Sequence, residues 1–169
     1  MPIVHLSQIP AIAADKELEN LQFRDFLKTI DSATIDAFVF ELNTAIEPQV
    51  NCTDCGNCCK TLMINVTEPE ADHLAQHLQQ SRTEFDEQFL EKGSNGMMLI
   101  NTIPCPFLAE NKCTVYEQRF AGCREFPGLD VPNFTKRLFT VFMHYSRCPI
   151  IFNVVEALKH KTNFIKIKA

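Results

Sequence analysis

The stretch CTDCGNCC, residues 52–59, places four cysteines among eight consecutive residues. It contains two overlapping Cys-x-x-Cys loops, from Cys52 to Cys55 and from Cys55 to Cys58. Such a loop lets two thiolates converge on one ion, because the intervening turn folds back toward the sulfurs. Gly56 supplies a residue that can adopt a positive φ within a tight turn. The spacing therefore predicts a metal-binding loop.

Four further cysteines extend this pattern through the second half of the chain. The order Cys-x2-Cys-x2-Cys matches the first three ligands of bacterial ferredoxins, in which a cysteine followed by proline is the fourth ligand. Two cysteines of this chain are followed by proline, at 105–106 and 148–149. We therefore take all eight cysteines as candidate metal ligands: Cys52, Cys55, Cys58, Cys59, Cys105, Cys113, Cys123 and Cys148.

Cys59 directly follows Cys58, and neighbouring side chains of an extended segment point to opposite faces. We therefore expect these two cysteines to serve different sites. The eight thiols can form two four-sulfur sites, or one complete site and a second, more open one. All-sulfur coordination suits both iron–sulfur clusters and zinc. The ferredoxin-like spacing favours an iron–sulfur cluster or iron, with zinc as the alternative.

The composition fits one ordinary globular domain. The chain has 169 residues, of which 46% are hydrophobic, and this is enough for a single core. Its net charge of -5 and the lack of any Lys or Arg run argue against nucleic-acid binding. No window approaches the roughly 18 apolar residues of a membrane-spanning segment, so we expect no membrane insertion.

The N-terminal segment, residues 1–17, lacks a basic leader, and polar residues and Pro10 interrupt its apolar positions. We therefore expect no signal peptide and a cytoplasmic protein. In a reducing cytosol, clustered cysteines bind metal or carry out redox chemistry more often than they form disulfides.

Hydrophobic periodicity predicts helices near both ends of the chain. Residues 15–48 form a helical hairpin with its turn near 29–32, and Asp31 or Ser32 caps the second helix. Residues 150–160 form a C-terminal helix. Between them lies the predicted metal-binding core, which is made of short elements.

This core, residues 51–149, contains two strands, two capped helices and a hairpin. Its elements are strands over 61–66 and 97–101, helices that begin at the capping boxes 67–70 and 81–84, and a hairpin with arms at 105–108 and 113–116. Residues 134–145 fit a helix, with a strand as the alternative. We therefore predict a single α+β domain over 1–169, in which a helical N-terminal hairpin and small strands surround a cysteine-rich metal centre.

Two other arrangements could carry chemistry. His73 and His77 are four residues apart on a predicted helix and could share one ion. A polar pair beside two inward-facing leucines explains them more simply. Cys55 or Cys58 could be the reactive thiol of an oxidoreductase, although such enzymes usually have two cysteines at the start of a helix rather than six more around them.

The order of these segments resembles the YkgJ-like cysteine-cluster family, whose hallmark is CxxCxxCC. The resemblance rests on CTDCGNCCK at 52–60, CPFLAENKCTVYEQRFAGCREFP at 105–127 and Cys148. It implies a zinc- or iron-chelating protein. The same cysteine pattern occurs in flagellin lysine methylases, which implies an iron–sulfur cluster. No Gly-rich nucleotide fingerprint follows a strand here, so methyl transfer by this chain is the weaker expectation.

Three functions are consistent with these observations. An iron–sulfur centre suits electron transfer, or the support of a redox or methyl-transfer enzyme, with a redox or client protein as partner. Zinc suits a structural or metal-handling module. Reactive thiols suit an oxidoreductase. In the first two, metal ions are the ligand, and the sequence leaves enzymatic activity open.

Overall fold

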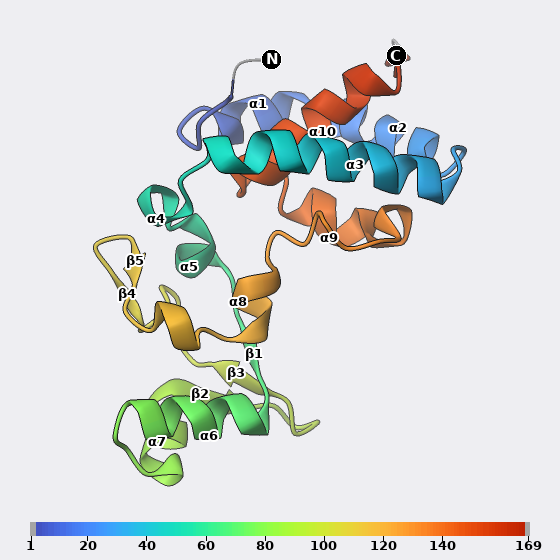
Figure 1. The fold of residues 1–169 in the computed structure, drawn as a ribbon. Coiled ribbons are helices and arrows are strands. Elements are labelled where there is room, and N and C mark those ends of the chain that lie inside the picture. Colours follow the sequence, from blue (N-terminus) through green and yellow to red (C-terminus); the bar gives the residue numbers. More distant parts are fainter. Residues whose placement is uncertain (1–2, 168–169) are drawn as a thin grey trace. The chain divides into compact units, whose positions relative to one another are not determined.

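The computed structural model describes residues 3–167. Helices make up 57% of the chain and strands 7%, which confirms the predicted α+β class. The chain forms two compact units, which we describe separately (Figure 1). The cysteine unit is Cys52–Phe126, and the helical unit contains the described residues before and after it. A single domain over 1–169 stays a prediction.

The helical unit is built around its C-terminal helix. Its elements are α1 (Ile9–Asp15), α2 (Glu17–Leu27), α3 (Ser32–Ile46), the 3-10 turns η1 (Glu47–Gln49) and η3 (Phe134–Arg137), α9 (Leu138–Met143) and α10 (Pro149–Lys161). Helix α10 is buried along most of its length and packs chiefly against α3 (Figure 1). Of the helices within residues 3–167, none combines the length and the apolar character needed to cross a membrane.

The predicted helices of this unit are present, except that the helix expected over 134–145 is a 3-10 turn, η3, followed by α9, which ends at Met143. Asp31 caps α3, and its carboxylate accepts a hydrogen bond from the Thr34 N–H at 3.0 Å. Helix α10 begins at Pro149, because a proline at the first helical position lacks only an N–H that would have no partner there. The principal partner of α3 is α10 rather than α2. Helix α1 was not predicted, since Pro10 and the polar residues before it interrupt the apolar pattern.

Charged side chains are buried inside the helical unit. Glu156 is 7% exposed and Lys159 is 5% exposed, and their charged groups lie 2.7 Å apart. Lys159 also contacts Glu19 and the Asn20 side-chain oxygen, each at 2.7 Å. The Tyr145 hydroxyl donates to Glu156 at 2.7 Å. The pairing of these groups offsets the cost of removing their charges from water.

The cysteine unit consists of much shorter elements. They are α4 (Cys52–Cys55), α5 (Asn57–Thr61), β1 (Asn65–Val66), α6 (Glu68–His77), α7 (Arg82–Phe89), β2 (Leu90–Lys92), β3 (Met98–Ile100), β4 (Leu108–Ala109), β5 (Lys112–Cys113), η2 (Tyr116–Gln118) and α8 (Ala121–Glu125). Strand β3 lies between β1 and β2, antiparallel to both, and β4 and β5 form a separate hairpin.

Both predicted capping boxes are present in this unit. Thr67 and Glu70 cap α6, and Ser81 and Glu84 cap α7. The strand expected over 61–66 is shorter than predicted, because α5 continues through Thr61 and only the last two residues pair with β3. Helix α7 ends at Phe89 rather than at Gly93, since the chain continues into β2.

The apolar core of the cysteine unit lies between its helices and its sheet. Phe85 of α7, Leu74 of α6 and Ile100 of β3 are among its buried members. Three cysteines are half-buried against this cluster, namely Cys105, Cys113 and Cys123. The core thus brings thiols from distant segments of the sequence to one surface.

Candidate metal centre

The quoted cysteine loop folds into two short helices joined at Gly56. Helix α4 carries Cys52 and Cys55, and α5 carries Cys58 and Cys59. The Gly56 N–H donates to the Cys52 carbonyl at 2.9 Å, which closes the first turn. Gly56 has a φ of 56°, a left-handed conformation that glycine adopts without steric cost. The predicted positive φ at this position is confirmed.

Gly56 also allows the β4–β5 hairpin to approach the cysteine loop. A Cβ at Gly56 would lie 3.2 Å from both the Cβ and the carbonyl oxygen of Asn111. Asn111 is part of the hairpin turn and itself has a φ of 65°. Cys113 follows on β5, where it pairs with Leu108. Figure 1 shows the hairpin beside α4 and α5, and β5 contacts α4.

Cys105 is fixed beside the cysteine loop by the backbone. Its N–H donates to the Cys59 carbonyl at 2.8 Å. The Cys105 carbonyl in turn accepts from the Leu108 N–H at 3.0 Å at the start of the hairpin. The backbones of two cysteines that are 46 positions apart in the sequence are therefore joined by a main-chain hydrogen bond.

Cys123 lies on α8, a short helix that the sequence analysis did not predict. The Cys123 N–H donates to the carbonyl of Phe120, whose ring is buried in the core of the unit. At the start of α8, the Ala121 N–H donates to Glu70 at 2.6 Å. Glu70 thus completes the capping box of α6 and also anchors the helix that carries Cys123.

The expectation that Cys58 and Cys59 point to opposite faces of an extended segment is wrong. Both lie on helix α5, and their Sγ atoms are 3.9 Å apart. Two sulfurs bound to one tetrahedral ion at a metal–sulfur distance of about 2.3 Å lie about 3.8 Å apart. The geometry of the pair is therefore compatible with a single shared ion.

The thiols of this unit perturb one another's pKa. The hydrogen bond with Cys59 lowers the pKa of Cys58 and raises that of Cys59. Burial raises the pKa of Cys105, with smaller contributions from Cys113 and Cys58. Burial raises the pKa of Cys123 to about 12, and the charges of Cys105, Cys58 and Cys113 act in the same direction. Cys105 and Cys123 are therefore each within electrostatic reach of several other thiols of the unit.

The remaining candidate residues are placed as follows. Cys52 is exposed and Cys55 is half-buried on α4. Cys148 belongs to the helical unit, where it is 7% exposed at the N-cap of α10. Its role as a ligand stays a prediction. His73 and His77 are both exposed on α6, as a polar surface pair would be.

The described residues offer a suitable donor set rather than a finished metal cage. Within residues 3–167, no group of three or more His, Cys, Asp or Glu side chains is already arranged to hold an ion. The donor chemistry nevertheless fits iron or zinc, because the clustered groups are soft sulfur ligands. The half-buried thiols Cys58, Cys59, Cys105, Cys113 and Cys123 would hold the metal, and rotation about χ1 would direct their sulfurs to it.

These features define a class of cysteine-rich α+β proteins whose thiols converge from a tandem Cys-x-x-Cys segment, a hairpin and a short helix. Residues 51–147 match the family CxxCxxCC, described as "Putative zinc- or iron-chelating domain". This match covers more than half of the chain, and the chain belongs to that family. No curated protein and no solved structure is significantly similar to the chain.

Proposed function

We propose that the chain is a metal-chelating protein whose cysteine unit binds a metal centre through thiolates. The observation that carries this proposal is the gathering of five half-buried thiols from three separate segments of that unit. They are Cys58, Cys59, Cys105, Cys113 and Cys123. Cys52 and Cys55, on α4 of the same unit, complete the proposed ligand set, as the sequence predicts.

The electrostatics of the thiols support this proposal. The thiolate is the form that binds metal. Burial and mutual repulsion raise the pKa of Cys105 and Cys123, so several thiolates together are unfavourable without a cation. A bound metal ion would lower the pKa of every ligand. Metal binding should therefore release protons and weaken as the pH falls.

Iron is the first candidate, either as an iron–sulfur cluster or as an ion. The Cys52, Cys55 and Cys58 spacing is that of a ferredoxin run, and Cys105 and Cys148 each precede a proline. An iron–sulfur centre suits electron transfer. It also suits support of a redox or methyl-transfer enzyme, in which case the chain would have a protein partner.

Zinc is the second candidate, and a different observation favours it. The 3.9 Å between the Cys58 and Cys59 sulfurs suits two ligands on one tetrahedral ion. In a [4Fe–4S] cluster, by contrast, four cysteines each bind a different iron, so their sulfurs lie farther apart. Zinc would make the chain a structural or metal-handling module.

Metal and sulfide analysis together with a visible absorption spectrum separates the two candidates. The full chain is purified without oxygen and without a metal-binding tag. A brown protein with iron and acid-labile sulfide in matching amounts supports the iron–sulfur centre. A colourless protein with stoichiometric zinc supports the second candidate. A protein that binds neither metal contradicts the proposal and favours the thiol oxidoreductase instead.

Single substitutions connect the bound metal to the named thiols. Cys58→Ser and Cys105→Ser should each lower the metal content, because each removes a thiolate from the cluster. Thr61→Ser is the matched control, since it lies in the same segment and preserves the hydroxyl that donates to the Asn57 carbonyl. Unchanged metal content in both cysteine variants would overturn the ligand assignment.

A further inference from the structure

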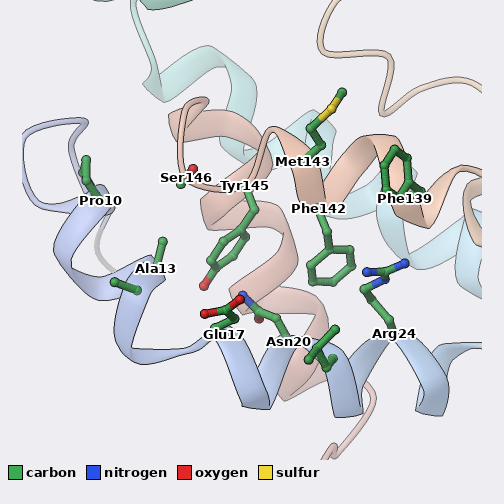
Figure 2. A pocket seen from close by; sticks show the side chains of 12 residues that line it. Pro10, Ala13, Glu17, Asn20, Arg24, Phe139, Phe142, Met143, Tyr145 and Ser146 are labelled. Carbon is green, nitrogen blue, oxygen red and sulfur yellow. The ribbon is translucent and has the colours of Figure 1, made fainter.

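A pocket of about 630 Å³ opens in the helical unit between α2 and α9 (Figure 2). Its volume lies within the roughly 300–1,000 Å³ range of small-molecule sites. The α9 side is lined by Phe139, Phe142 and Met143, and Leu21 faces them from α2. Phe139 is 71% exposed, although large aromatic rings are usually buried. The walls thus offer apolar surface that the fold itself leaves uncovered.

One cation lines this apolar pocket without an acidic partner. Figure 2 shows the Arg24 side chain extending from α2 toward the Phe142 ring, and the guanidinium carbon lies 5.8 Å from the ring centroid. Among residues 3–167, Arg24 forms no ion pair, and its buried Nε has no hydrogen-bond partner. A guanidinium presents several donors in a planar fork that matches a carboxylate. An anionic group entering the pocket would meet the guanidinium of Arg24, whose charge no acidic side chain of the described residues neutralises.

The floor of the pocket is held in place before any ligand arrives. Asn20 and Tyr145 line it, and both belong to the buried charge network. The Asn20 side-chain oxygen accepts from Lys159 at 2.7 Å, and the Tyr145 hydroxyl donates to Glu156 at 2.7 Å. Such preorganisation reduces the entropy lost on binding. The pocket therefore has the rigid floor and apolar walls of a binding site.

A second charged group gives the two ends of the pocket opposite charges. Glu17 lines it as well, seven residues before Arg24 on the same helix. This spacing corresponds to about 10 Å along the helix axis. The Arg24 end therefore attracts a carboxylate, whereas the Glu17 end repels one. A ligand with acidic groups at both ends would be disfavoured.

We propose that this pocket binds a small monocarboxylate with an apolar body, whose carboxylate pairs with Arg24 and whose body packs between Phe139, Phe142 and Leu21. The site lies within the helical unit and uses none of the cysteines in the proposed ligand set. It is therefore a second binding site of the chain, and its existence does not depend on the identity of the metal.

The test is a titration of the isotope-labelled, metal-loaded full chain, followed by amide NMR spectra. The probes are 4-phenylbutyrate and its uncharged analogue 4-phenylbutyramide. We expect 4-phenylbutyrate to shift the backbone amide signals of α2 and α9 saturably. It should bind roughly tenfold more tightly than 4-phenylbutyramide, because the uncharged probe lacks the charge-assisted hydrogen bond. Equal affinity for both probes, or no saturable shift at α2 and α9, overturns the proposal.

Three variants locate the charge that the ligand uses. Arg24→Gln should weaken the acid roughly tenfold and leave the amide unchanged. Lys28→Gln is the matched control, because it removes one positive charge from the exposed end of the same helix and should change neither affinity. Phe139→Ser removes an exposed wall and should weaken both probes. If Arg24→Gln leaves the acid's affinity unchanged while its metal content and spectrum show a folded chain, the assignment is wrong.

Discussion

The helical unit and the cysteine unit differ in how much stability their own helices and strands can provide. Helix α10 has 13 residues and is buried along most of its length. The cysteine-bearing helices α4, α5 and α8 have four or five residues, and the strands have two or three. Helices this short are not stable alone, since nucleation is costly. We therefore expect a bound metal to stabilise the cysteine unit in addition to its small apolar core, whereas helix packing stabilises the helical unit.

The two units also differ in how their buried charges are compensated. The helical unit pairs its buried charges within itself, as Lys159 does with Glu156 and Glu19. The cysteine unit concentrates thiols that repel one another when ionised, with Arg119 acting against the raised pKa of Cys123. A metal ion would supply the opposite charge in the second unit. The difference can therefore be tested by removing the compensating positive charge from each unit in turn, namely the metal from the cysteine unit and Lys159 from the helical unit.

Metal removal should have the largest effect, and it should be confined to the cysteine unit. Structural zinc contributes roughly 10–16 kcal/mol of apparent binding free energy, as much as the stability of a whole domain. Hydrogen exchange measured by mass spectrometry, with and without a chelator, should show amides of 52–126 losing protection. Equal loss of exchange protection in both units would contradict this difference between them.

Lys159→Met should have the next largest effect, and it should act on the helical unit. Breaking a buried ion pair typically costs about 3–5 kcal/mol, and the cost here should lie near the lower end because Lys16 still pairs with Glu156. Hydrogen exchange in α10 should report this loss while the metal content stays constant. The double variant with Glu156→Gln should regain part of the stability. Loss of metal from Lys159→Met would instead indicate that the two units depend on each other.

Gly56→Ala should destabilise the cysteine unit by about 1–2 kcal/mol for the left-handed backbone alone, with a further cost for the close approach of Asn111. Gly96→Ala is a matched control, because Gly96 has a φ of 79° and nothing within 4 Å of its Cβ position. Competition with a metal chelator should show weaker binding for Gly56→Ala alone. Equal binding by the two variants would argue against the hairpin contact.

Of these changes, mild acid should have the smallest effect, and it should act on the helical unit. Hydrogen bonds and charges from Lys159 outweigh burial and hold the pKa of Glu19 and Glu156 below their ordinary value of 4.5. The stability that these carboxylates contribute is complete well above pH 4.5 and is lost as the pH falls through their folded pKa. Exchange protection of α10 should therefore change little from pH 7 to 5 and decline below 4.5. The double variant lacking Lys159 and Glu156 should show a weaker decline.

The elements that could be predicted from the sequence are those set by local rules. The two capping boxes and the Asp31 cap lie within four residues of the backbone groups they bind. The helices of the cysteine loop were missed, because a segment of closely spaced cysteines has no apolar periodicity. No local pattern marks Glu156 and Lys159 as buried, since their partners Lys16 and Glu19 are 140 positions away.

For the candidate site, the sequence could name candidate ligands but not their grouping in space. The spacing of Cys52, Cys55 and Cys58 identified the loop. That Cys105 lies beside Cys59 depends on a hydrogen bond between distant segments. Gly56 was a usable signal for the turn, but its close approach to Asn111 follows from the hairpin position. The pocket at α2 and α9 also joins distant segments, and no sequence motif marks it.

The most direct test of the proposed thiolate centre is X-ray absorption spectroscopy of the full chain purified without oxygen, at the iron and zinc edges. We predict one stoichiometric metal centre with a first shell of sulfur at about 2.3 Å. Cys58→Ser and Cys105→Ser should each reduce the sulfur contribution. A first shell of oxygen and nitrogen alone, or a folded cysteine unit without bound metal, would contradict the account.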